Sequence, residues 1–98
     1  MLINKVEEDL NIIYPANYTE QDIQNLITEI NTITVDFIPR KIILLNKILS
    51  LNLILYIFEK FGQECEIVLE EEPYNLLQTK KDIILQKYNN INITLNKG

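Results

Sequence analysis

The longest apolar stretch of the chain runs from Ile42 to Phe58, where thirteen of seventeen side chains are apolar and Lys47 carries the only charge. From about Asn46 onward a helix would be apolar almost all round, and such a helix is buried. The pattern favours a core helix from Asn46 to Gly62 over a helix with one face on a partner. A transmembrane span is least favoured, because spanning needs about 20 apolar residues and Lys47 is costly in a bilayer.

Short apolar or alternating segments predict the strands of a sheet. The predicted strand Leu10–Tyr14 stops at Pro15, which cannot continue a ladder. Residues Leu2–Val6 also fit a helical turn, whereas Ile91–Asn96 has the clearest alternation of apolar and polar residues. The predicted strands are Leu2–Val6, Leu10–Tyr14, Ile33–Ile38, Cys65–Glu70 and Ile91–Asn96.

The first helix has the strongest local signals in the chain. Thr19 can cap it, and Asp22 can return a bond to the Thr19 amide. Tyr18 precedes the cap and can pack on Ile23 as a hydrophobic staple. An apolar stripe at helical spacing then continues to a predicted end near Asn31. The stripe favours core packing over a partner-docking face, and it consists of Ile23, Leu26, Ile27 and Ile30.

A third helix is predicted from Pro73, a residue suited to a helix N-terminus, to the break at Asn89 and Asn90. Its apolar positions include Leu76, Leu77, Ile83, Ile84, Leu85 and Tyr88. The residues between the third strand and the central helix, Pro39–Leu45, are predicted to form a loop with an apolar second half.

Helices between successive strands predict an α/β fold with a single four- or five-stranded mixed sheet. The strands alternate rather than being apolar throughout, so about three helices are expected mainly on one face, with the other face partly wet. The 98 residues are expected to form one domain, residues 1–98.

The composition and net charge of the chain argue against several classes of partner and cellular location. The net charge of −5 and the scattered Lys and Arg residues argue against a nucleic-acid backbone as partner. A single cysteine forbids an internal disulfide, and the N-terminal residues lack the apolar region of a signal peptide. We therefore expect a cytoplasmic protein without membrane insertion.

The sequence carries no catalytic, metal-binding or cofactor-binding signature. It has no His and only two Gly, which removes the commonest acid/base and any phosphate-cradling loop. Ser50, the only serine, is expected within the central helix, and Cys65 is expected to point to the core. The acidic run Glu70–Glu72 favours a solvated surface over a cation site. We predict that the protein is not an enzyme.

The order of elements resembles the STAS domain of bacterial anti-sigma factor antagonists and of the small cytosolic subunit of lipid-transporting ABC systems. The resemblance covers nearly the whole chain and rests on element order and spacing. Its segments are LNIIYP, TEQDIQNLITEI, TVDF, EIVLEEEP and YNLLQTKK. Where STAS antagonists have an acidic residue, Ser or Thr and Gly, this chain reads IILLNK, so no phosphoacceptor is carried over.

The resemblance implies a non-catalytic interaction module, without a phosphorylatable serine, that regulates or stabilises a partner such as a nucleotide-binding regulator or ATPase. The alternative is a small acidic inhibitor or immunity-type protein that blocks a basic site on its target. Either can use a homo-oligomer. The predicted partner-binding residues are Pro39, Arg40, Lys41, Ile42, Leu45, Asn46 and Lys47.

Overall fold

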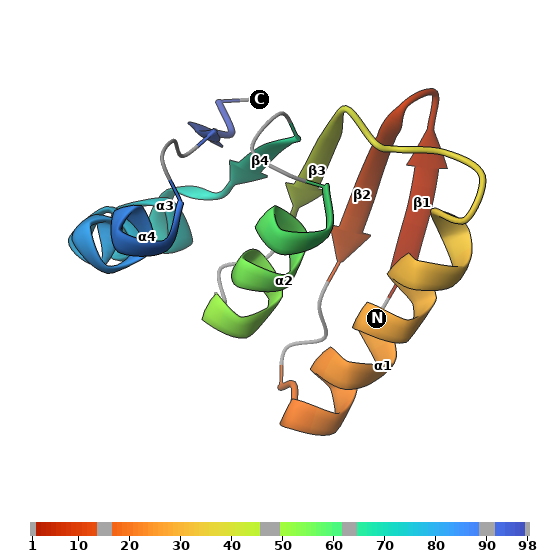
Figure 1. Ribbon diagram of the computed structural model, residues 1–98, viewed down its shortest axis with the longest axis horizontal. Helices are drawn as coiled ribbons and strands as arrows, with labels where there is room; N and C mark the ends of the chain where they lie inside the picture. The colour runs from red at the N-terminus through yellow and green to blue at the C-terminus, as the bar shows by residue number, and fades with distance from the viewer. Residues whose placement is uncertain (1, 14–16, 46–49, 62–64, 89–91, 98) are drawn as a thin grey trace.

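The computed structural model describes residues 2–13, 17–45, 50–61, 65–88 and 92–97 (Figure 1). Two strands open the chain, and helices then alternate with strands. The elements are β1 (Leu2–Val6), β2 (Asp9–Ile13), α1 (Glu20–Ile33), β3 (Lys41–Leu44), α2 (Leu51–Phe61), β4 (Glu66–Leu69), α3 (Glu71–Thr79), α4 (Lys81–Lys87) and β5 (Ile93–Leu95).

The strands form one mixed sheet whose spatial order, β1-β2-β3-β4-β5, is also the order of the sequence. β1 pairs antiparallel with β2, and the remaining neighbours are parallel. Helices α1 and α2 lie in front of the sheet in Figure 1, and α3 and α4 lie beside β4 and β5. The predicted α/β class with a single mixed sheet is therefore confirmed, with five strands and four helices among the described residues.

The core lies between the helices and one face of the sheet. Alternate residues of the three central strands are at most 1% exposed: Leu10, Ile12, Ile42, Leu44, Ile67 and Leu69. They join one hydrophobic cluster with the inward stripes of the helices, including Ile23, Leu26 and Ile30 of α1, and Phe58 of α2. The helical stripe predicted for the first helix is thus used in the core, apart from Ile27, which packs against the cluster while only partly buried.

Helix α1 begins as its local sequence predicts. The Thr19 amide donates to Asp22 Oδ2 at 2.8 Å, and the Asp22 amide donates to Thr19 Oγ1 at 3.2 Å. This reciprocal pair satisfies two amides that the helix itself leaves unpaired. The helix continues to Ile33, past the predicted end near Asn31. The proposed packing of Tyr18 on Ile23 stays a prediction.

The strand predicted over Ile33–Ile38 is wrong, and so is the loop predicted over Pro39–Leu45. Ile33 ends α1, and the next strand is β3. Ladder pairing starts after Pro39, which has no N–H to donate. The Arg40 amide donates to the Glu8 carbonyl at 2.8 Å. β3 then pairs with β2 and β4, and this position between two strands buries Ile42 and Leu44, which a loop would leave exposed to solvent.

The central apolar stretch contains a strand and a helix rather than one long helix. Helix α2 begins at Leu51, after the predicted start at Asn46, which lies outside the described residues, as does Gly62. The prediction that Ser50 lies within the helix is therefore wrong, because Ser50 occupies the N-cap position. The Leu53 amide donates to Ser50 Oγ at 3.3 Å, and the Ile54 amide donates to the Ser50 carbonyl at 3.2 Å.

The C-terminal part of the chain departs from the prediction in several details, and its first helix begins at Glu71 rather than at Pro73. The predicted strand Cys65–Glu70 is shorter, because Glu70 serves as the N-cap of α3. The third helix is two helices, which meet at Lys80. The last strand begins at Ile93 within the described residues.

Tyr88 packs the C-terminal part of the chain against α2. Its ring lies 5.4 Å from that of Phe58, and its hydroxyl donates to the Leu55 carbonyl at 3.2 Å.

The alternation in β3 predicts very different costs for two neighbouring truncations. Ile42→Ala removes a fully buried side chain and should lower the free energy of unfolding by about 2–5 kcal/mol. Ile43→Ala removes a half-buried side chain from the other face and should cost about 1 kcal/mol. Urea denaturation of both variants measures the difference. Equal losses would contradict the strand assignment of this segment.

Candidate partner-binding surface

Helices α1 and α2 lie on one face of the sheet, and no described helix lies on the opposite face (Figure 1). Its residues alternate with the core residues along β2, β3, β4 and β5. Val68 belongs to this face, because it is the one buried aliphatic side chain outside the core cluster among the described residues. We call this surface the open sheet face and define it by Asp9, Asn11, Ile13, Lys41, Ile43, Leu45, Glu66, Val68 and Thr94.

An aliphatic strip crosses the open sheet face over its three central strands. Ile43 and Val68 are direct partners in the β3–β4 register. Leu45 follows Ile43 on the same side, and its amide donates to the Ile12 carbonyl at 2.9 Å, which keeps it alongside β2. Ile13 is 37% exposed, whereas Val68 in the middle is 9% exposed. The aliphatic strip consists of Ile13, Ile43, Leu45 and Val68.

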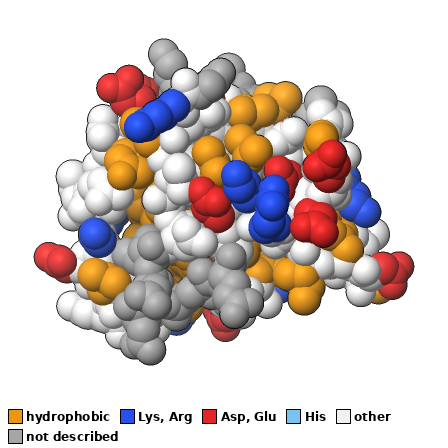
Figure 2. All heavy atoms as spheres, turned by 90° about the horizontal axis from the view of Figure 1, so that it is seen from above, with side chains coloured by type: hydrophobic (Ala, Val, Ile, Leu, Met, Phe, Trp, Pro, Cys, Tyr) orange, Lys and Arg blue, Asp and Glu red, His pale blue; other side chains and the backbone are white. Residues whose placement is uncertain are grey.

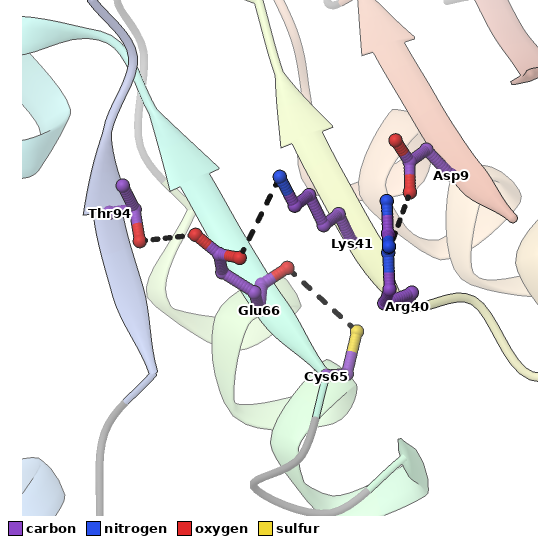
Figure 3. Close-up of polar contacts among 6 residues, drawn as sticks. All are labelled: Asp9, Arg40, Lys41, Cys65, Glu66 and Thr94. Carbon is purple, nitrogen blue, oxygen red and sulfur yellow. Dashed lines mark hydrogen bonds and ion pairs between the residues drawn. The ribbon is translucent and has the colours of Figure 1, made fainter.

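A row of charges borders the strip at the amino ends of the parallel strands (Figure 3). Lys41 stands between Asp9 and Glu66 in the strand register. Lys41 Nζ lies 4.0 Å from Glu66 Oε1, and Arg40 Nε lies 3.9 Å from Asp9 Oδ1. Thr94 Oγ1 donates to Glu66 Oε2 from the neighbouring strand. The two ion pairs, at 3.9 and 4.0 Å between partly exposed groups, contribute little stability, so their charged groups remain available to a partner.

Cys65 lies beside this charged row but inside the molecule. It is 2% exposed, and its Sγ–H points to the Glu66 carbonyl 3.9 Å away. Burial, and to a smaller extent the carboxylates of Glu66 and Asp9, raise the pKa of the Cys65 thiol from 9.0 to about 11. A thiol that stays protonated near neutral pH is a poor nucleophile. The chemistry of Cys65 is that of a core residue.

A pocket of about 490 Å³ lies at the carboxyl ends of β3 and β4, lined by Leu45, Glu70, Glu71 and Glu72. Glu70 Oε1 accepts from Asn96 Nδ2 at 3.4 Å. Glu71 and Glu72 occupy the first turn of α3, where the helix dipole stabilises negative charge. The described residues contain no group of three or more ligand-type side chains placed to hold a metal ion.

The predicted partner-binding segment does not form a single exposed loop. Its described part, residues 39–45, runs along β3 from the amino end to the carboxyl end of the parallel strands. Pro39 is buried and Ile42 is 0% exposed, so neither can offer its side chain to a partner on the surface. The Arg40 side chain is 65% exposed at the amino edge. Lys41 and Leu45 lie on the open sheet face, and the last two predicted residues, Asn46 and Lys47, lie outside the described residues.

Sequence reasoning missed Ile43 and Val68. The spacing of Lys41, Ile43 and Leu45 was the available signal, but it was hidden by the interpretation of this segment as a loop. Sequence reasoning also treated the predicted segment and the acidic run Glu70–Glu72 as separate regions. The fold brings them together, because Leu45 and these three glutamates line one pocket.

Aliphatic side chains are also exposed at the amino end of the sheet. Val35 and Ile38, in the loop between α1 and β3, are 77% and 75% exposed, and Val6 is 52% exposed. Figure 2, which views the molecule from above, shows hydrophobic side chains among charges of both signs on this end. With acidic and basic side chains intermixed, the charges here favour no single class of partner.

A scan against protein-family models, a search of curated proteins and a search of solved structures each returned no match. Among the described residues, the helices are too short or too polar for any of them to cross a membrane. The role of the open sheet face is therefore inferred from its own residues.

The raised pKa of Cys65 predicts slow reaction with thiol reagents. Near pH 8 the thiolate fraction of a thiol with a pKa of about 11 is about 100-fold lower than that of one at 9.0, and burial slows access further. Reaction with 5,5′-dithiobis(2-nitrobenzoate) should therefore be at least about 100-fold slower in the native protein than in urea. Comparable rates would contradict the burial of this side chain.

The same shift has a consequence for stability. Because the pKa is raised on folding, the stabilising contribution is complete below pH 9.0 and is lost as pH rises towards about 11. Urea denaturation of the native protein and of Cys65→Ala between pH 8 and 11 separates this loss from that of other groups. The variant should show a shallower decline.

Proposed function

We propose that this chain is a non-catalytic cytoplasmic interaction module that regulates or stabilises a partner protein bound to the open sheet face. The observation that carries the proposal is the aliphatic strip on the uncovered side of β2, β3 and β4. Parallel sheets rarely have one face exposed to solvent. Their strands carry apolar side chains on both faces, and helices usually pack on both. An uncovered aliphatic surface on such a sheet is typical of an association site.

The STAS-like interpretation is kept as part of this proposal. It is supported by the alternation of helices and strands after an opening strand pair. Ser50 supports the absence of a phosphorylatable serine, because it is 7% exposed and its Oγ accepts the Leu53 amide at the start of α2. In this interpretation the partner is a nucleotide-binding regulator or ATPase.

The acidic pocket supports a second candidate function, that of an inhibitor or immunity-type protein. Glu70, Glu71 and Glu72 converge with Leu45 on one cavity, which would suit a basic group of a target. The two functions differ in which side chains are essential: Ile43 in the first, and the exposed Glu71 and Glu72 in the second.

Ser50 should take up no phosphate from a kinase. Its hydroxyl is buried and already accepts a backbone hydrogen bond, so transfer requires the start of α2 to unfold. Incubation with extract of the native host and ATP, followed by mass spectrometry, should show the unmodified Ser50 peptide. Stoichiometric phosphoserine at this position would restore the phosphorylation switch of STAS antagonists.

Affinity capture from the native host tests the proposed surface. The baits are the wild-type chain, Ile43→Lys on the strip and Gln24→Lys on the exposed side of α1, so that both variants gain one positive charge. The wild-type chain and Gln24→Lys should enrich the same protein. Ile43→Lys should reduce its capture by about tenfold or more, as expected when a central interface residue loses its contacts.

Thermal unfolding of each bait first establishes that it is folded. Undiminished capture by Ile43→Lys would place the interface elsewhere. If Glu71→Lys combined with Glu72→Lys abolishes capture instead, the inhibitor function is favoured.

A further inference from the structure

The open sheet face has the character of a surface that is covered in the functional state. β3 reads KIIL and β4 reads EIVL, so three consecutive aliphatic residues in each strand serve both faces of the sheet. Such continuous runs are typical of parallel strands covered on both sides. α1 and α2 cover one side of these strands, and the described residues provide no helix for the other (Figure 1).

The dimensions of the aliphatic strip fit a helix. The strip spans β2, β3 and β4, from Ile13 across Leu45 and Ile43 to Val68. Neighbouring strands lie about 4.8 Å apart, so three strands span about 10 Å. An α-helix with its side chains is about 10–12 Å wide. One helix laid on the strip would cover what remains exposed of Ile13, Ile43 and Leu45 and would contact Val68, and it would complete a helix–sheet–helix arrangement.

The charges around the strip select the kind of helix. At its carboxyl end lie Glu70, Glu71 and Glu72, and the ion pairs resolved among the described residues do not involve them. At its amino end the carboxylates of Asp9 and Glu66 are each paired with a cation, Arg40 and Lys41, so this end is close to neutral. The border of the strip is therefore mainly acidic, and so is the whole chain at −5. Complementary charges steer association and set partner choice.

We propose that the partner element that covers the open sheet face is an amphipathic helix whose aliphatic stripe is flanked by Lys and Arg. This inference rests on the proposed function and names the class of partner. A second copy of this chain fits less well, because both open sheet faces would bring a mainly acidic border to the interface.

A display library of amphipathic helical peptides tests the charge preference. Half of its members have an aliphatic stripe flanked by Lys and Arg, and half have the same stripe flanked by Asp and Glu. Selection on the immobilised full chain should enrich the basic half by tenfold or more. Enriched peptides should bind Ile43→Glu at least tenfold more weakly, and raising the salt from 50 to 500 mM should weaken their binding to the wild-type chain.

Ile43→Thr serves as a second variant, because it keeps the β-branched shape suited to a strand while reducing the apolar contact. It should weaken binding in the same direction. Gln24→Glu on the exposed side of α1 is the matched control, because it adds the same charge as Ile43→Glu, and it should bind the peptides as the wild-type chain does.

Three outcomes of the peptide selection would overturn the inference: enrichment of the acidic half, no enrichment at all, or enriched peptides that bind Ile43→Glu and the wild-type chain equally. Sedimentation equilibrium showing a dimer that Ile43→Glu dissociates would also overturn it, in favour of a second copy. These failures are separate from failure of the proposed function. An acidic peptide bound through Ile43 leaves the open sheet face as the interaction surface, whereas undiminished capture of the host partner by Ile43→Lys removes it.

Discussion

The structure depends on the pairing of β3 between β2 and β4. Ile42 and Leu44 fill the centre of the core from this strand, and their neighbours in register, Leu10 and Ile67 among them, complete one layer. Helices α1 and α2 can pack only on the continuous aliphatic surface that these pairings create. The same four residues of β3 also fix the open sheet face, because burying one set of alternate side chains directs the other set outward.

Local sequence was sufficient where the stabilising contacts are local. The bonds between Thr19 and Asp22 connect residues three apart, and the start of α1 was predicted from them. The position of β3 depends instead on strands far away in the sequence. Both Ile33–Ile38 and Lys41–Leu44 have strand-like residues, and only pairing with β2 and β4 selects the second. A continuous apolar run also has no periodicity to divide it, so the boundary between β3 and α2 was invisible.

The candidate surface was predicted in part. Lys41 and Leu45 were named from sequence and lie on the open sheet face, whereas Ile42 was named and is buried. The difference is a matter of register: a shift of one residue along a strand moves a side chain from surface to core. Val68 breaks the polar alternation of its strand, but that signal does not say which side chains lie beside it. It becomes part of the surface only because β4 pairs beside β3 and places it next to Ile43.

The identity between strand order and sequence order has a consequence for how the molecule can assemble itself. Every strand neighbours the strand that precedes it in the chain, so the sheet can grow in one direction, from the β1–β2 hairpin towards β5. Each added helix–strand unit contacts mainly the unit before it, as in a repeat protein. Each parallel pairing nevertheless joins strands on either side of a whole helix, so it must close a long loop and is expected to form more slowly than the β1–β2 hairpin. The last unit, ending in the three-residue β5, is supported from one side only and is expected to open before the rest.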